Sequence, residues 1–261
     1  MNRQLTVCIL AMLPLVAALS PRVQAQQVQT LSPAQAALES AQQSQKYLFI
    51  MFWKNDDAAT KAMRQTLDSS LTAQSDKASS VFVMMKDPTE KAIVDQYGVS
   101  RSPMPLVLAI APNGAITRGF PLKLADEDVG SAIVSPAHAA CLKANQTDKL
   151  VLLCVQPAGP APELPSGVTA FKADSQYNKS TEIVIVHADD PIEADFLKGL
   201  AISPKTTVTV TTLLAPPRQI VATFEGTFTK EQAIEKLKAA QAGCCPDGKC
   251  GPGGCKPSSK K

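Results

Sequence analysis

Two uninterrupted apolar runs set the strongest limit on how this chain can fold. The first reads YLFIMFW, from Tyr47 to Trp53, and the second reads LVLLCV, from Leu150 to Val155. A strand with one solvated face alternates between polar and apolar residues, so a run without alternation predicts a strand buried on both faces. Helices must then cover both faces of the sheet around it. The two runs therefore predict an α/β protein.

The pattern around the first run predicts the order βαβαββα after an opening helix. Ser32 is expected to cap that first helix, and Pro112-Asn113-Gly114 is expected to join two strands as a hairpin. The first half is predicted to have helices over 33–45, 58–73, 88–97 and 126–144, and strands over 47–53, 80–85, 106–111 and 115–120. A kink at Pro136 is the alternative for the last helix.

The second half repeats this order. Its hairpin phrase TLLAPPRQIVATFEG follows the first-half phrase LAIAPNGAITRGF. Strands are predicted over 150–155, 182–186, 208–214 and 219–224, and helices over 166–177, 191–200 and 229–240, the last one capped by Thr229. The prediction is two tandem domains, each a mixed β-sheet flanked by helices, because each hairpin makes one edge antiparallel.

The first 25 residues have the pattern of a secretory signal peptide. Arg3 precedes an apolar run from Leu5 to Ala18, and Val23-Gln24-Ala25 gives a small-residue cleavage pattern. The alternative is a membrane anchor, but the run is shorter than the ~20 residues a spanning helix needs. We expect an exported protein, periplasmic or extracellular, with no integral membrane segment after cleavage.

Charge excludes one class of partner. Without Arg3 and Arg22, the remaining basic residues nearly balance the 23 acidic ones, and no basic stripe follows a helix or strand. Nucleic-acid binding proteins need such a stripe to neutralise phosphates. No nucleic-acid partner is therefore expected.

Two phrases of the first half resemble the thioredoxin-like superfamily. YLFIMFWKNDDAATKAM resembles the strand and helix that carry the redox dithiol, and DQYGVSRSPMPLVLAIAPNGAI resembles the later segment with a cis-proline. The resemblance implies a first thioredoxin-like domain over 26–147. It implies a divergent second one over 148–242, where only the topology and the hairpin phrase match.

The resemblance also implies a cleft without a dithiol. Its two cysteine positions fall on Asp57 and Thr60, neither of which can form a thiolate. Trp53 matches an aromatic beside the dithiol, and either Pro103 or Pro105 matches the cis-proline. No catalytic residue is assigned. The chain looks like the redox-inactive domains of disulfide isomerases, which bind protein partners or unfolded chains through this cleft. The alternative interpretation is that Trp53 only packs the strand end.

Other polar and thiol residues have plainer interpretations. Cys141 and Cys154 are interpreted as small core residues, with a disulfide between them as the alternative. His187 with three acids nearby is a weak candidate metal site, because acids at such positions more often complement the start of a helix. Those acids are Asp189, Asp190 and Glu193.

The last nineteen residues, 243–261, form a Cys-, Gly- and Lys-rich tail that is predicted to be flexible. It reads GCCPDGKCGPGGCKPSSKK and contains Cys244, Cys245, Cys250 and Cys255. An oxidising compartment favours two local disulfides. Thiolates also select Cu(I) or Zn(II), so metal handling is the second hypothesis for function. A third is thiol–disulfide exchange by these cysteines.

Overall fold

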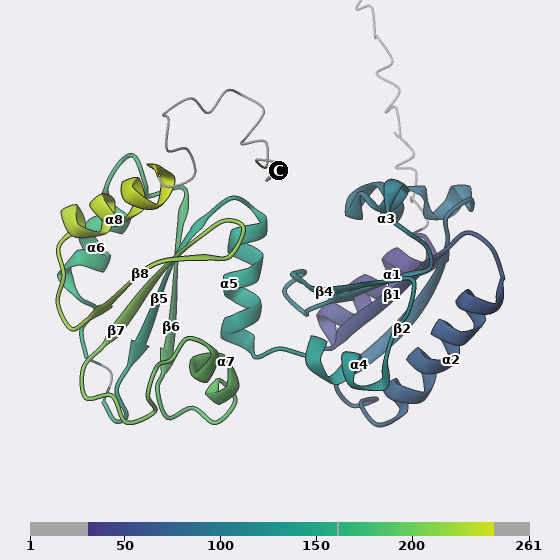
Figure 1. Cartoon of the computed structure of the whole chain (residues 1–261), viewed down its shortest axis with the longest axis horizontal. Helices are drawn as coiled ribbons and strands as arrows, with labels where there is room; N and C mark the ends of the chain where they lie inside the picture. The colour runs from purple at the N-terminus through teal and green to yellow at the C-terminus, as the bar shows by residue number, and fades with distance from the viewer. Residues whose placement is uncertain (1–30, 161, 243–261) are drawn as a thin grey trace, which may run out of the picture. The chain divides into compact units, whose positions relative to one another are not determined.

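The computed structural model describes residues 31–160 and 162–242 and contains two four-stranded mixed sheets (Figure 1). The expected signal peptide, 1–25, and the expected flexible tail, 243–261, lie outside these residues. The first sheet and its helices are α1 (Pro33–Gln43), β1 (Tyr47–Trp53), α2 (Ala58–Thr72), β2 (Ala78–Met84), η1 (Pro88–Glu90), α3 (Lys91–Tyr97), η2 (Val99–Arg101), β3 (Leu106–Ile110), β4 (Ile116–Pro121) and α4 (Asp126–Ala132). The second sheet and its helices are α5 (Pro136–Gln146), β5 (Leu150–Gln156), α6 (Ser166–Ala173), β6 (Thr181–His187), α7 (Ala194–Gly199), β7 (Val210–Ala215), β8 (Gln219–Glu225) and α8 (Lys230–Ala242).

Both sheets have the same topology. Their strand orders are β2-β1-β3-β4 and β6-β5-β7-β8. In each, the first two strands of the chain pair in parallel and the remaining pairs are antiparallel. Each half therefore has the thioredoxin-like arrangement that the sequence predicted. The two apolar runs form β1 and β5, which are interior strands of their sheets.

The strand β1 is buried on both faces, as its sequence predicted. Phe49 and Met51 belong to one hydrophobic core, which includes residues of α2 and α4. Leu48, Ile50 and Phe52 belong to the core on the other face, which includes residues of α1 and α3. Each of these five strand residues is at most 1% exposed. The run lacks alternation because both of its faces meet helices.

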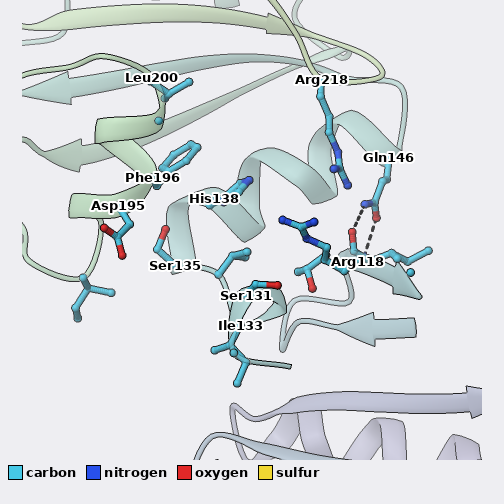
Figure 2. Close-up of a pocket in the computed structure, with 17 residues that line it drawn as sticks. Arg118, Ser131, Ile133, Ser135, His138, Gln146, Asp195, Phe196, Leu200 and Arg218 are labelled. Carbon is cyan, nitrogen blue, oxygen red and sulfur yellow. Dashed lines mark hydrogen bonds between the residues drawn. The ribbon is translucent and has the colours of Figure 1, made fainter. Parts of the chain in front are cut away.

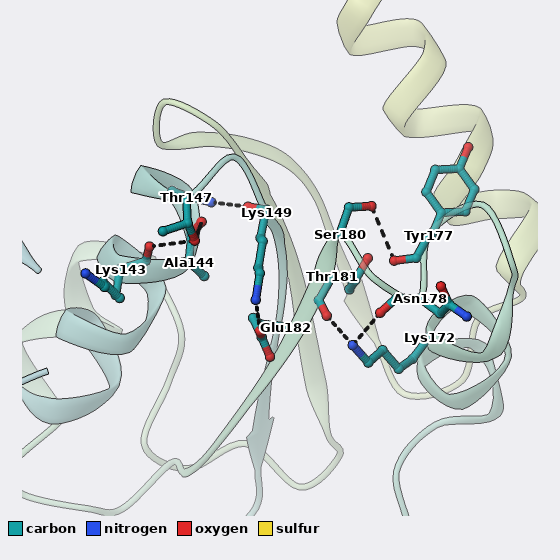
Figure 3. Close-up of polar contacts among 11 residues, drawn as sticks. Lys143, Ala144, Thr147, Lys149, Lys172, Tyr177, Asn178, Ser180, Thr181 and Glu182 are labelled. Atoms are coloured by element: carbon teal, nitrogen blue, oxygen red, sulfur yellow. Dashed lines mark hydrogen bonds and ion pairs between the residues drawn. The ribbon is translucent and has the colours of Figure 1, made fainter. Parts of the chain in front are cut away.

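The second sheet is covered in the same way. In Figure 1, α5 and α7 lie on one side of it, and α6 and α8 lie on the other. Two lysines hold the start of β6 (Figure 3). Lys149 forms a 2.5 Å ion pair with Glu182, and Lys172 donates to the carbonyls of Asn178, at 2.7 Å, and Thr181.

The predicted helix over 126–144 is wrong, because the structure has two helices there. α4 ends at Ala132, and α5 begins at Pro136 after an extended Ser135. Proline is well accommodated in the first turn of a helix, where its missing N–H costs nothing, but not in a helix interior. Pro136 therefore starts a new helix rather than bending the old one. The predicted helices over 166–177 and 191–200 are likewise shorter, as α6 and α7.

The helix α5 packs against both sheets. Ala139 and Leu142 belong to the core that contains Phe49 and Met51 of β1. Ala137, Cys141 and Ala144 belong to the core that contains alternate residues of β5. The described residues accordingly fall in one compact unit although they form two sheets.

A repeated motif holds the start of α5 beside the second sheet and the start of α1 beside the first. The helices read PAQAALESAQQ and PAHAACLKANQ, each after a serine. Buried Glu90 accepts hydrogen bonds from the Ser32 hydroxyl (2.6 Å) and the Ala34 N–H (3.2 Å). Buried Glu193 accepts one from the Ala137 N–H (2.8 Å). A carboxylate is thus buried at the positive end of each helix, where it satisfies a free backbone donor.

Within the described ranges, none of the helices has the length and apolar character that crossing a membrane requires.

We predict that a fragment comprising 135–242 folds alone, whereas a fragment comprising 148–242 does not. The shorter fragment lacks α5 and exposes Val151, Leu153 and Val155, which are fully buried in the whole chain. Burying a side chain of this size contributes about 1.5–3 kcal/mol. The loss approaches the about 5–15 kcal/mol that stabilise a whole domain. Circular dichroism during urea unfolding measures the difference, and equal midpoints for the two fragments would show that α5 is dispensable.

Candidate functional site

The candidate site is a cleft in the first domain, where β1 ends and α2 begins. It has a volume of about 330 Å³, and its other wall is the loop that enters β3. The lining residues are Lys54, Asn55, Asp57, Thr60, Ser102, Pro103, Met104 and Pro105. Four of the five predicted cleft residues therefore come together, and Trp53 is not among the residues that line the cavity.

Asp57 and Thr60, at the positions that the resemblance matches to a dithiol, shape the start of α2. Asp57 is the N-cap, and its carboxylate accepts a 2.9 Å hydrogen bond from the Thr60 N–H. Hydrogen bonds from the Thr60 backbone and side chain lower the pKa of Asp57. Thr60 is buried, with 1% of the residue's surface exposed. Its hydroxyl donates a 2.8 Å hydrogen bond to the Asn55 carbonyl. The first position is thus exposed and anionic, and the second is buried and neutral.

The loop before β3 shows that Pro105, rather than Pro103, is the cis-proline. The peptide bond between Met104 and Pro105 is cis, and Pro103 precedes it in the same wall of the cleft. The Pro105 carbonyl accepts a 2.7 Å hydrogen bond from the N–H of Leu122, which follows β4.

Leu122 is a neighbour of the cleft that sequence reasoning missed. Its side chain is 56% exposed, and its backbone has a φ of 70°. Bulky residues rarely adopt this left-handed conformation. The corresponding turn of the second domain has Gly226 with the same φ of 70°, bonded to the Thr209 carbonyl at 2.8 Å. Comparing the two hairpins residue by residue would have drawn attention to Leu122.

Trp53 lies at the end of β1 next to Lys54 and is half-buried. The Arg64 guanidinium lies over its ring, 5.6 Å from the centroid, and over the Phe82 ring at 4.7 Å. Cation–π contacts of this kind hold an aromatic ring in place. The ring is thus held against α2 and packs the strand end, and it does not itself line the cavity.

The two described cysteines lie outside the cleft and are buried. Cys141 and Cys154 are both free and buried, and they belong to the cores on opposite faces of the second sheet. The alternative of a disulfide between them is therefore wrong. Burial raises the pKa of Cys141 to about 12 and that of Cys154 to about 11, so both remain protonated near neutral pH. The four tail cysteines lie outside the described residues.

The candidate metal site at His187 is not assembled. In the described part of the chain, no three His, Cys, Asp or Glu side chains are grouped as metal ligands. Asp190 caps its own turn by accepting from the Ile192 N–H at 2.9 Å. Glu193 is directed to the start of α5, as described above. Asp190 thus stabilises a turn, and Glu193 stabilises the start of α5 rather than the start of α7, which it precedes.

No protein-family model and no curated protein matches the chain. Solved structures match weakly. A domain of the alkylhydroperoxide reductase AhpF from Enterococcus faecalis is 14% identical, with 77% of this chain and 98% of that one covered and a TM-score of 0.30. The first two thioredoxin domains of Eps1p from Naumovozyma dairenensis are 10% identical, with 77% and 93% covered and a TM-score of 0.27. A disulphide isomerase from Xylella fastidiosa is 15% identical, with 38% and 83% covered and a TM-score of 0.30. Values this low identify neither a relative nor an activity.

We predict that the double variant Asp57→Cys, Thr60→Cys forms a disulfide and gains disulfide reductase activity. An exposed thiol would then lie at the N-terminus of α2, where the helix dipole lowers a thiol pKa, with a buried thiol one turn later. Insulin reduction in the presence of dithiothreitol measures the gain. The control variant Asp56→Cys, Thr60→Cys changes the spacing. Equal activities in the two variants would show that positions 57 and 60 are not the dithiol positions.

Proposed function

We propose that the protein is a redox-inactive, thioredoxin-like binding module that holds an extended segment of a protein or peptide in the first-domain cleft. One observation carries this proposal. The two dithiol positions are used for the architecture of α2, by the Asp57 cap and the buried Thr60, while the cleft around them stays open. Such a site can bind a chain but has no nucleophile for exchange with a disulfide.

The chemistry of the cleft suits an extended polypeptide. Lys54, Asn55 and Ser102 offer hydrogen-bond donors, and the Asp57 carboxylate is an acceptor. An extended backbone presents donors and acceptors in alternation and pairs with such a surface. Met104 in the wall and exposed Leu122 beside Pro105 supply apolar contacts for a partner side chain. A retained leucine in a left-handed conformation is costly, which supports a role for its side chain.

The proposal places this binding outside the cytoplasm, in the periplasm or the extracellular space. The signal peptide pattern of residues 1–25 supports this location. Partners at such a site are exported chains before their own folding is complete.

The single tryptophan of the chain provides the test, because Trp53 directly precedes Lys54 of the cleft lining in the chain. We expect a tryptophan-free unfolded polypeptide with blocked thiols to change Trp53 fluorescence saturably. Ser102→Arg places a long charged side chain in the cleft wall and should weaken this binding about tenfold or more, the range of a lost buried contact. The matched control Ser69→Arg changes an exposed serine of α2 outside the cleft. Equal affinities of both variants and the unchanged chain would refute the proposal.

A second candidate function is metal handling by the tail. Burial removes Cys141 and Cys154 from thiol chemistry in the folded state. The exchangeable ligands of a mature chain are then Cys244, Cys245, Cys250 and Cys255, four soft sulfurs within twelve positions. Two disulfides among them are the alternative state, and thiol exchange by the same cysteines is the third hypothesis.

We predict that replacing the four tail cysteines by serine abolishes stoichiometric Cu(I) or Zn(II) binding. It should shift the free energy of unfolding of residues 31–242 by less than about 1 kcal/mol, as surface changes do. Metal analysis and thiol counting on protein isolated from its own compartment distinguish ligands from disulfides. Metal that stays bound after the replacement would assign the site elsewhere, and four unreactive sulfurs before reduction would indicate disulfides.

A further inference from the structure

A cavity of about 1020 Å³ lies away from the cleft, and nothing in the proposed function uses it. Its walls come from β4, from the connection between α4 and α5, from α5 and α7, and from the turn between β7 and β8 (Figure 2). Its volume is at the upper end of the range for small-molecule sites. The question is which chemistry its walls present.

Two arginines meet at one end of this cavity. Arg118 comes from β4 and Arg218 from the turn after β7, a hundred residues later. Figure 2 shows both side chains extending toward the region beside Gln146. Within the part of the chain that the structure describes, the ion pairs involve lysines and neither of these guanidinium groups. Asp195, the acidic residue of the lining, is drawn at the opposite end.

The charges of both arginines reach a third residue of the cavity. His138 lies on α5 in the same wall, and its pKa is lowered by burial and further by the charges of Arg218 and Arg118. Both guanidinium groups are thus close enough to affect one imidazole. Both arginines are exposed, so that their guanidinium groups are open to a ligand, and an oxyanion between them would gain charge-assisted hydrogen bonds from each.

The backbone at Arg218 is also held in an unfavourable state. Its φ is 134°, which residues with a side chain rarely adopt. The strain falls on the residue that carries the charge into the cavity. Strained residues of this kind persist where the surrounding structure or a function requires them.

Hydrogen bonds hold the walls in fixed positions. The Gln146 side chain accepts from the Ile116 N–H at 2.9 Å and donates to the Ile116 carbonyl at 2.6 Å, which joins α5 to β4 two residues before Arg118. Glu193 joins the start of α5 to the segment before α7. These hydrogen bonds therefore fix the elements that form the arginine end of the cavity.

The rest of the cavity suits a flat apolar group. The rings of His138 and Phe196 are stacked, with centroids 4.5 Å apart and an angle of 7° between their planes. Ile133 and Leu200 extend this surface. Figure 2 shows the stacked rings between the arginine end and Asp195.

We propose that this cavity binds a small organic anion, with its phosphate or carboxylate group between Arg118 and Arg218 and its apolar part against Phe196. Planar guanidinium groups bind such oxyanions through paired, charge-assisted hydrogen bonds. The site lies outside the proposed peptide cleft, so either assignment can fail without the other.

Nuclear magnetic resonance of the histidine rings tests the proposal, because the chain has two histidines, His138 and His187. The protein is used as the whole chain without a polyhistidine tag, and phenyl phosphate is the probe. We expect the His138 signals to shift saturably and the His187 signals to stay unchanged. Benzyl alcohol, a neutral molecule of similar shape, should have no such effect. Inorganic phosphate should bind more weakly than phenyl phosphate.

Arginine variants make the test specific. Arg118→Gln and Arg218→Gln should each weaken phenyl phosphate binding about tenfold or more, as expected for a lost charge-assisted hydrogen bond. The control Arg101→Gln changes an exposed arginine outside the cavity and should leave the affinity unchanged. Without probe, neither cavity variant should lower the thermal unfolding midpoint. The proposal is overturned by unsaturable or equal shifts of both histidines, by unchanged affinity in both cavity variants, or by a lowered midpoint that accounts for the lost binding.

Discussion

The burial of α5 on two sides is the interaction on which the rest of the structure depends. Ala139 and Leu142 complete the core of the first sheet, and Ala137, Cys141 and Ala144 complete that of the second. Because alanines dominate both faces, the backbone of the helix can approach both sheets closely. The short α4 leaves part of the first sheet to be covered by this helix. One helix thus serves as the last cover of one domain and the first of the next.

The two domains share a fold but differ at the positions of the cleft. Leu106 pairs with Phe52 as Val210 pairs with Val155, so Thr209 takes the place of Pro105 in the second domain. In the sequence, nine residues separate β5 from α6, whereas four separate β1 from α2. The second domain shares the framework, including the buried carboxylate at its first helix, and has different residues where the first has its cleft.

The apolar runs and hairpin phrases were enough to predict the strands, their order and the two-domain plan, because burial on both faces leaves a direct trace in composition. The placement of Asp57 and Thr60 in the cleft could be predicted from local sequence phrases. The division between α4 and α5 did not, because alanine-rich segments continue a helical pattern through Pro136. The partner of Glu193 lies 56 residues away, and no local pattern specifies such a contact. The same holds for Arg118 and Arg218, which only the tertiary structure brings to one cavity.

Cys141 and Cys154 are protected only after helices have covered both faces of β5. Before that stage, their thiols compete with the four tail cysteines for any oxidant, since exposure and ionisation control thiol reactivity. If residues 1–25 are removed as proposed, the six remaining cysteines allow fifteen complete pairings, and a native state with two free thiols is none of them. In an oxidising compartment, the yield of native protein therefore depends on whether α5 docks before disulfides form. For a chain exported as proposed, the buried thiols make the yield depend on the folding rate.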